Sequence, residues 1–259
     1  MNEIVLKVEH LWKSFGGLTA VCDYRLDLPK GKIFGLIGPN GAGKTTIFNL
    51  ISGVLRADRG RIMFHGQDIT YARPDQIASL GLTRTFQNLR LFSSLTVEMN
   101  LKAAAHLHVD YDVPSCLLCL PSFFRKEAAV ERMAEEILTV FEMRQFKNER
   151  ASSLPYGLQR KLDIARSLMT KPSLLLLDEP SSGMNTAEAE ELARLVAQIT
   201  DIFTLTMVIV EHRMPFVMGL AEIIQVIDYG SILAEGSPED IREDPKVIEA
   251  YLGAGEVIA

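Results

Sequence analysis

Residues 32–53, KIFGLIGPNGAGKTTIFNLISG, decide the fold of this chain. The run Ile33–Ile37 is short and mostly apolar, which predicts a buried strand. It leads into Gly38–Thr45, a full match to the pattern GxxxxGK[ST]. The helical pattern that follows places Ile47 and Leu50 on one face. Strand, glycine-rich loop and helix in this order predict a phosphate-binding loop, and a chance match of a glycine-rich turn is the weaker alternative.

The chemistry of phosphate binding requires this order of residues. Glycines let the backbone turn successive N–H groups toward phosphate oxygens, and the helix N-terminus adds partial positive charge. Lys44 is expected to reach the β- and γ-phosphates, and the Thr45 hydroxyl to bind Mg²⁺. The residues expected to bind the nucleoside triphosphate, here called the cradle, are Gly38, Pro39, Asn40, Gly41, Ala42, Gly43, Lys44, Thr45 and Thr46.

A second segment, PSLLLLDEPSSGMN at residues 172–185, predicts the acidic part of the site. Leu174–Leu177 is a continuous apolar run typical of a buried parallel strand, and the carboxyl ends of such strands line a ligand crevice. Asp178 is therefore expected to hold Mg²⁺, directly or through water. Glu179 is expected to accept a proton from the attacking water. An ordinary acidic turn is the alternative, and the nearby cradle makes it weaker.

A further apolar run, TLTMVIVEH, ends at His212. A histidine after a buried strand can donate a hydrogen bond to the γ-phosphate, or it can serve as a structural hydrogen-bonding group. The residues by themselves leave both interpretations open.

Composition limits the class of protein. The 259 residues are 47% hydrophobic and 23% charged, which suits one large domain or a core with an inserted subdomain. A net charge of −6 argues against binding nucleic acid through bulk charge. No apolar run approaches the roughly 18 residues of a membrane span, and the first 15 residues lack the apolar core of a secretory signal. We expect a soluble, cytoplasmic protein.

The three cysteines are too few for a disulfide scaffold. Cys116 and Cys119, with His106 and His108 upstream, form a conceivable zinc site. Their surroundings, CLLCLPSFF, are apolar, and buried cysteine commonly behaves as a small hydrophobic residue. We therefore expect no metal at these cysteines.

Several motifs together resemble the ATP-binding subunits of ABC transporters. The cradle, TFQN at 85–88, LLLLDEP and VEH occur in that family's order, and the similarity covers nearly the whole chain. The segments RTFQNLRLF, LPYGLQR, DEPSSGMN and EHRMPFVMGLAE are most similar to the ATPase subunits of branched-chain amino acid importers.

The resemblance implies an α/β fold. It consists of a P-loop NTPase core with a mainly parallel sheet flanked by helices, an N-terminal antiparallel β subdomain and an inserted α-helical subdomain. We expect one ABC ATPase domain over 1–259, with the core and β subdomain at 1–87 and 160–259. The helical subdomain is expected at 88–159, where KEAAVERMAEEILTVFEM has helical apolar spacing.

The resemblance also implies roles for single residues. Gln87 matches the loop glutamine that contacts Mg²⁺ or the attacking water, and His212 matches the switch histidine at the γ-phosphate. Phe15 lies where the family stacks an aromatic ring on adenine, with Trp12 as the nearby competitor. The expected catalytic residues are thus Glu179, His212 and Gln87, and the expected Mg²⁺ ligands are Thr45, Gln87 and Asp178.

Residues Leu154–Leu158, the signature segment, depart from the family's usual LSGGQ. In the family this segment contacts the ATP of the partner subunit, so Tyr156 and Gly157 are expected at that nucleotide. Pro155 has neither hydroxyl nor N–H, but it suits a helix start, and a well-patterned helix follows. We interpret the segment as a working variant. Asn185 is a second departure, because the family generally has aspartate there.

The predicted function is an ATP-hydrolysing motor subunit with ATP and Mg²⁺ as cofactors, importing branched-chain amino acids. Expected partners are a second ABC ATPase subunit, either the same chain or a related one, and membrane permease subunits. A periplasmic or extracellular substrate-binding protein would act indirectly, and no nucleic acid is expected. The chain would lie in the cytoplasm, on the inner face of the membrane. Alternatives are another cargo (urea or amides, other amino acids, or exported lipid or lipopolysaccharide) and, less favoured, a non-transport ABC ATPase.

Overall fold

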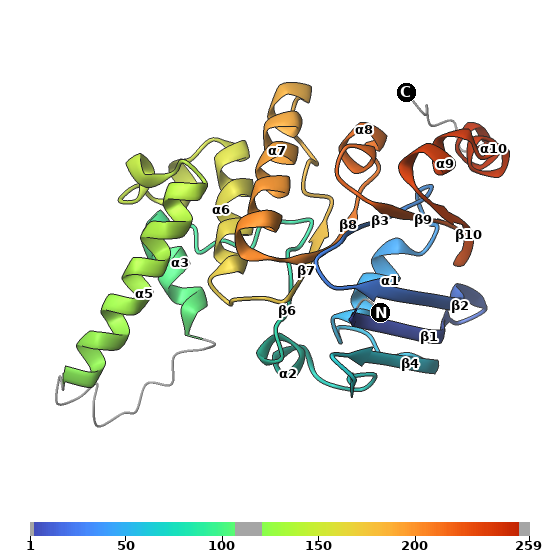
Figure 1. Ribbon diagram of the computed structural model, residues 1–259, viewed down its shortest axis with the longest axis horizontal. Coiled ribbons are helices and arrows are strands. Elements are labelled where there is room, and N and C mark those ends of the chain that lie inside the picture. Colours follow the sequence, from blue (N-terminus) through green and yellow to red (C-terminus); the bar gives the residue numbers. More distant parts are fainter. Residues whose placement is uncertain (1–2, 107–120, 254–259) are drawn as a thin grey trace. The chain divides into compact units, whose positions relative to one another are not determined.

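The computed structural model describes residues 3–106 and 121–253 (Figure 1). The chain forms two compact units, the first made of residues 1–87 and 173–259 and the second of residues 88–172. The second unit includes helix α6 (Tyr156–Leu168), because α6 packs against α3 (Val97–Ala105) and α5 (Pro121–Val140).

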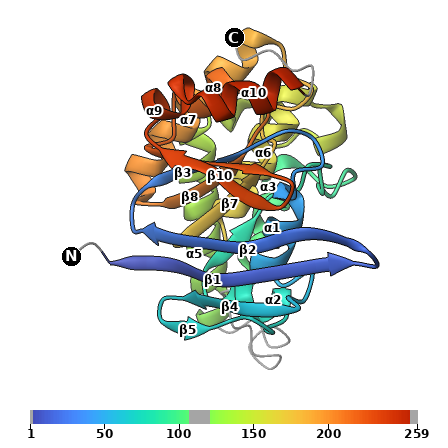
Figure 2. The same ribbon diagram turned by 90° about the vertical axis from the view of Figure 1, so that its right-hand side faces the viewer.

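The first unit contains a four-stranded antiparallel sheet in the order β2-β1-β4-β5 (Figure 2). Its long strands alternate buried and exposed residues, as expected for a sheet with one face on the core. The bounds are β1 (Ile4–Phe15), β2 (Leu18–Pro29), β4 (Arg59–Phe64) and β5 (Gln67–Asp68).

A six-stranded sheet in the order β10-β9-β3-β8-β7-β6 forms the centre of the first unit. All its pairs are parallel except β10 with β9. Every residue of β3, β7 and β8 is buried, which explains their continuous apolar runs. The bounds are β3 (Ile33–Ile37), β6 (Leu82–Arg84), β7 (Leu174–Asp178), β8 (Thr206–Val210), β9 (Ile223–Asp228) and β10 (Ser231–Gly236).

Helices α7 and α9 of the first unit begin at residues whose side chains cap them. Asn185 caps α7, accepting a hydrogen bond from the Glu188 amide at 2.9 Å while the Glu188 carboxylate accepts from the Asn185 amide at 3.0 Å. Ser237 and Asp240 form the same reciprocal cap on α9. The bounds are α1 (Lys44–Ile51), α2 (Pro74–Ser79), α7 (Thr186–Phe203), α8 (Met214–Met218), α9 (Pro238–Glu243) and α10 (Pro245–Gly253).

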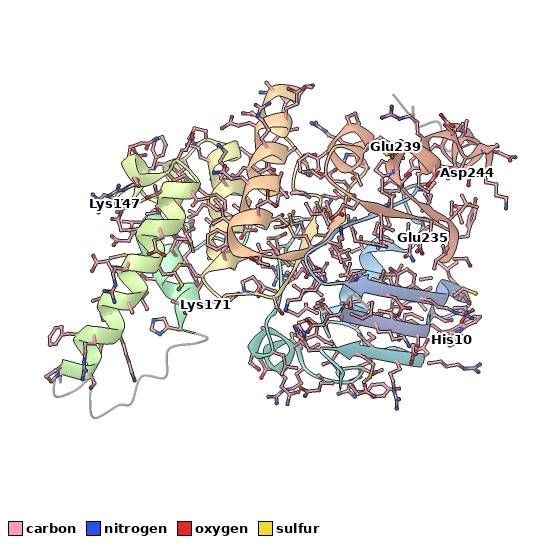
Figure 3. All side chains as sticks on the ribbon, in the orientation of Figure 1. His10, Lys147, Lys171, Glu235, Glu239 and Asp244 are labelled. Atoms are coloured by element: carbon pink, nitrogen blue, oxygen red, sulfur yellow. The ribbon has the colours of Figure 1, made fainter. Side chains whose placement is uncertain are left out.

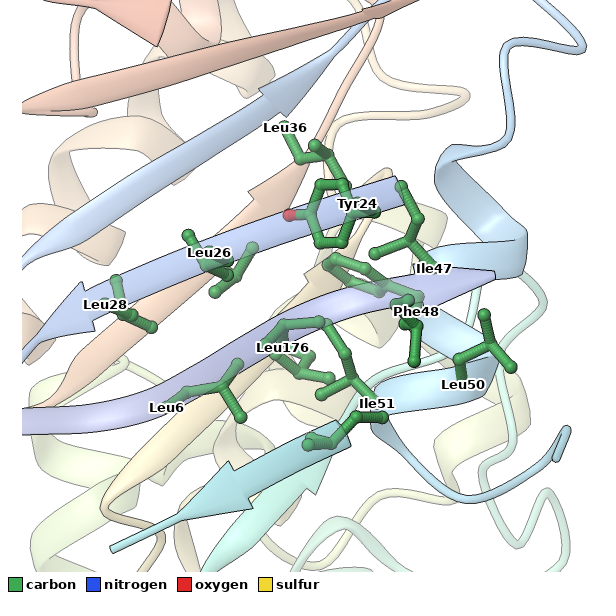
Figure 4. Close-up of a cluster of buried hydrophobic side chains, with 14 of the residues drawn as sticks. Leu6, Tyr24, Leu26, Leu28, Leu36, Ile47, Phe48, Leu50, Ile51 and Leu176 are labelled. Atoms are coloured by element: carbon green, nitrogen blue, oxygen red, sulfur yellow. The ribbon is translucent and has the colours of Figure 1, made fainter. Parts of the chain in front are cut away.

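One apolar cluster joins both sheets of the first unit to α1 (Figure 4). Leu6 and Tyr24 from the antiparallel sheet, Phe48 from α1, and Leu36 and Leu176 from the parallel sheet are all buried in it. Burial of this kind stabilises by roughly 1.5–3 kcal/mol per large side chain. The cluster therefore fixes α1, and with it the cradle, against the central strands.

The second unit is helical. Besides α3, α5 and α6 it has short 3₁₀ turns η1 (Arg144–Phe146) and η2 (Ala151–Ser153). Val130, Ala134 and Ile137 form the buried face of α5, at the helical spacing predicted from the sequence. Lys147, labelled in Figure 3, lies 2.8 Å from the Glu135 carboxylate of that helix. The predicted fold class is thus confirmed: a mainly parallel core, an antiparallel sheet and an inserted helical segment.

Candidate functional site

The cradle turns at two glycines that have no room for a side chain. Gly38 and Gly43 have φ angles of 149° and 109°, which residues with a Cβ rarely adopt. A Cβ on Gly38 would collide with the carbonyl of Ile227, and one on Gly43 with the carbonyl of Ala20. The loop is therefore packed backbone to backbone against β2 and β9, as a rigid cradle requires.

The start of α1 presents hydrogen-bond donors. No side chain caps this end, and its first turn has no acidic residue. Lys44 is buried, and its ammonium donates to the carbonyls of Gly38 at 2.5 Å and Pro39 at 2.9 Å, while Thr45 is exposed. Backbone N–H groups, a helix N-terminus and a buried ammonium are the donor set that phosphates prefer. These residues fit a nucleotide's phosphate chain.

Three candidate catalytic side chains meet at Glu179. The Gln87 amide donates to the Glu179 carboxylate at 2.8 Å, and Nδ1 of His212 lies 3.8 Å from the same oxygen. Glu179 itself has a φ of 46°, unusual for a residue with a side chain, and its amide donates to the Val210 carbonyl at 2.8 Å. Such strained backbone is common where a reactive group must be aimed. The three residues therefore form one cluster, although they are far apart in the sequence.

Asp178 is held by a residue that the sequence did not single out. The Arg84 guanidinium donates to its carboxylate at 2.7 Å, and both side chains are about 5% exposed. The same guanidinium donates to Asn49 at 2.7 Å and to Ser52 at 3.0 Å, both on or next to α1. Arg84 thus connects the cradle helix to the acidic strand. The cradle and Asp178 belong to one site.

A sequence signal for Arg84 existed in hindsight. It ends β6, a three-residue strand paired in parallel with β7, so its side chain comes from the strand next to Asp178. Its guanidinium also lies over the Phe48 and Phe86 rings, 5.5 and 5.1 Å from their centroids. An arginine three residues before the loop glutamine, at the end of the strand beside a buried acid, indicates an ion pair. From the sequence, RTFQ was interpreted only as part of a family motif, and the Arg84–Asp178 pair was not predicted.

Phe15 is suitably exposed for stacking. It ends β1 with 47% of its surface accessible, whereas Trp12 is half-buried. The Lys13 ammonium lies 5.5 Å from the centre of the Phe15 ring and donates to Asp58 at 2.7 Å. That hydrogen bond, with one from the Ser14 amide, lowers the pKa of Asp58. The arrangement supports Phe15 over Trp12 as the candidate adenine contact.

The signature segment lies in the second unit. Pro155 is the N-cap of α6 and Tyr156 its first residue, so the expected helix start is present. Tyr156 is 43% exposed, and its ring lies 5.6 Å from the guanidinium carbon of buried Arg160. The side-chain amide Nε2 of Gln159 donates to the Leu154 carbonyl at 2.8 Å and fixes the turn before the helix. The N-cap Pro155 accepts no side-chain hydrogen bond from this helix, so its side chain satisfies none of the first amides, which suits a helix start that binds an anion.

The other sequence predictions concern Asn185, a metal site at the cysteines and a membrane span. Asn185 has a structural explanation as the cap of α7. Cys116, Cys119 and His108 lie outside the described residues. Within residues 3–106 and 121–253, no three histidine, cysteine or acidic side chains are grouped to hold a metal. No helix in the described part of the chain is both long and apolar enough to cross a membrane.

Comparison with known families decides the identity of this site. The family model described as "ABC transporter" matches residues 21–182, from β2 through the acidic strand. The chain belongs to the ABC transporter family. It is the ATPase subunit, which binds and hydrolyses ATP for transport as part of a transporter complex. A second model, described as "Branched-chain amino acid ATP-binding cassette transporter", matches residues 231–257 of this ABC ATPase.

Curated relatives and solved structures agree on the family. The chain is 40% identical to the high-affinity branched-chain amino acid transport ATP-binding protein BraF of Pseudomonas aeruginosa, and 42% identical to LivG of Escherichia coli K12. Each alignment covers 98% of this chain and 99% of the relative. A crystal structure of a nucleotide-free ATP-binding cassette matches with a TM-score of 0.82 at 30% identity, over 96% of this chain and 98% of that one. The ADP conformation of an ATP-binding cassette gives the same TM-score and identity, over 96% and 99%.

Proposed function

We propose that this ABC ATPase drives the import of branched-chain amino acids. The convergence of Gln87 and His212 on the Glu179 carboxylate, in the unit that carries the cradle, supports hydrolysis at this site. The names of the relatives at 40–42% identity, and the family model at residues 231–257, support the cargo. The other cargoes considered from the sequence have no comparable support.

The proposed mechanism assigns each side chain a step. The cradle amides and Lys44 hold the phosphate chain, and the Glu179 carboxylate takes a proton from the water that attacks the γ-phosphate. Gln87 fixes that carboxylate and orients the water. His212 directs Nδ1 at Glu179, so its Nε2 is the nitrogen left to donate to the γ-phosphate. Mg²⁺, held by Thr45, Asp178 and Gln87, would neutralise charge on the phosphates.

Completion of the site requires a second ATPase subunit, either the same chain or a related one. The exposed Tyr156 and the adjoining Gly157 at the start of α6 are the proposed contacts to the partner's nucleotide. Permease subunits would hold the pair on the inner face of the membrane, and an extracytoplasmic binding protein would deliver the cargo to them. ATP binding would close the pair, and hydrolysis would reopen it.

A transport assay tests the cargo directly. The chain is reconstituted in proteoliposomes with the proposed permease subunits and binding protein, and uptake of labelled leucine is measured. We expect ATP-dependent leucine uptake that unlabelled isoleucine and valine compete with and urea does not. The complex with Lys44→Ala serves as the control with weakened ATP binding. ATP-dependent uptake of urea but not leucine would contradict the proposal while leaving the ATPase assignment intact.

A further inference from the structure

A buried carboxylate lies beside the switch histidine and has no role in the mechanism above. Glu211 directly follows β8 and is fully buried. One of its oxygens accepts a hydrogen bond from the Ser181 amide at 2.7 Å. The other accepts from the amides of His212 at 3.1 Å and Arg213 at 3.4 Å. Its two oxygens therefore bind two different loops.

The environment of Glu211 shows what holds it in place. Besides the three amides, its carboxylate lies 3.9 Å from Nδ1 of His212. A buried carboxylate is costly unless fixed N–H groups satisfy both oxygens. Here those groups are backbone amides, so the carboxylate and the two loops hold one another in place.

Two more hydrogen bonds join the same loops. The Glu179 amide donates to the Val210 carbonyl at 2.8 Å, and the Arg213 guanidinium donates to the Met184 carbonyl at 2.6 Å. The loop 179–184 is thus attached to the segment 210–213 near its start, in its middle at Ser181 and at its end. Asn185, the cap of α7, follows directly.

We propose that Glu211 is a positioning residue that makes the loop of Glu179 and the loop of His212 move as one body. This inference rests on the proposed function. When His212 shifts at the γ-phosphate, we expect Met184 and Asn185 to shift with it. Glu211 would then link the position of His212 to the loop that carries Glu179 and to the start of α7.

Glu211→Gln tests the link with almost no change of shape. The new amide group replaces one acceptor with a donor, which must face either the Ser181 amide or those of His212 and Arg213, so one loop is released. Hydrogen exchange is followed by mass spectrometry with and without the non-hydrolysable analogue AMP-PNP. In the unmodified protein we expect peptides from 179–185 and 210–214 to change protection together. In the variant we expect one of these two peptides to exchange at least tenfold faster. Its protection should then no longer change together with that of the other peptide when AMP-PNP is added.

Kinetics separate positioning from mere structural support. Because the cradle is untouched, Glu211→Gln should lower kcat about tenfold or more while the KM for ATP and the affinity for AMP-PNP stay within twofold. Glu222→Gln, an exposed glutamate paired with Lys32, is the matched control and should change neither quantity. A lower melting temperature with unchanged kcat and coupled exchange would show a structural role only and overturn the inference.

A second variant keeps the test decisive if Glu211→Gln does not fold. Arg213→Gln removes the hydrogen bond from the Arg213 guanidinium to the Met184 carbonyl, and Arg213 is only partly buried. We expect the same loss of coupled hydrogen exchange, with a smaller change in rate. If the folded variant binds nucleotide and the peptides 179–185 and 210–214 still change protection together, the proposed role of Glu211 is contradicted. Failure of the unmodified protein to bind AMP-PNP would instead contradict the proposed function.

Discussion

The candidate functional residues of the two units differ in how they are held. In the first unit, two buried acids are bonded to other parts of that unit: Asp178 to Arg84, and Glu211 to two loops. In the second unit, the signature segment exposes Pro155 and Tyr156 at an end of α6 that no side chain caps. The first arrangement suits groups that must be aimed within one subunit, and the second suits groups that meet a separate molecule.

This difference predicts how strongly the two sets of residues respond to substitution. A change that removes one of the buried partners leaves a buried charge or donor unpaired, which costs several kcal/mol. A change in the exposed signature segment alters a contact that is proposed only for the closed pair, so its effect on folding should be small. The following variants test this contrast, in order of decreasing effect.

Arg84→Ala should have the largest effect on stability. It leaves the Asp178 carboxylate buried without its cation, which typically costs about 3–5 kcal/mol of the free energy of unfolding. Urea unfolding followed by circular dichroism measures the loss. Arg73→Ala, which breaks the exposed pair with Asp75, is the control and should change stability by less than about 0.5 kcal/mol. Equal effects of the two variants would remove the distinction between buried and exposed pairs.

Lys44→Ala should weaken ATP binding more than it affects folding. Charge-assisted hydrogen bonds are worth about 1.5–3 kcal/mol each, so the dissociation constant should rise roughly 10- to 100-fold. Isothermal titration calorimetry with ATP checks this value. Lys161→Ala, on α6 of the second unit, provides the comparison and should bind ATP as the unmodified protein does. Unchanged affinity in Lys44→Ala would disprove the cradle assignment.

Pro155→Ser should have the smallest effect. A serine cap adds about 1 kcal/mol to a helix, but loss of the rigid proline removes about 0.4–1 kcal/mol, so the melting temperature should barely move. The added hydroxyl can supply one hydrogen bond across the closed pair, about 0.5–1.5 kcal/mol, or less than roughly tenfold in ATP-driven association. Analytical ultracentrifugation measures that association. A rise far above tenfold would show that the natural segment is impaired rather than a working variant.

The sequence was most informative where one short stretch contains a whole structural unit. Strand, glycine loop and helix are contiguous at residues 32–53, so β3, the cradle and α1 could be predicted together, and the antiparallel and parallel sheets were also predicted correctly. Meeting points between distant segments could not be found in this way. Arg84 with Asp178 and Glu211 with Ser181 depend on strand order, β6 beside β7 and β7 beside β8, which local patterns do not specify.

The boundary of the second unit illustrates the same limit. The boundary expected from the sequence, between residues 159 and 160, falls inside α6. The packing of α6 on α3 and α5, rather than any composition change near residue 160, decides that the unit continues to Pro172. Long-range packing of this type leaves no signal in a single sequence.

The most direct test of the account is the nucleotide retained by Glu179→Gln. The variant keeps the shape of the side chain but removes the proton acceptor, which should lower kcat roughly 10²- to 10⁴-fold without weakening ATP binding. The protein is incubated with Mg²⁺ and ATP, freed of unbound nucleotide on a rapid desalting column, and its bound nucleotide is identified by chromatography. The account predicts intact ATP on the variant and ADP on the unmodified protein. ADP on both, formed at equal rates, would contradict the assignment of Glu179 as the base.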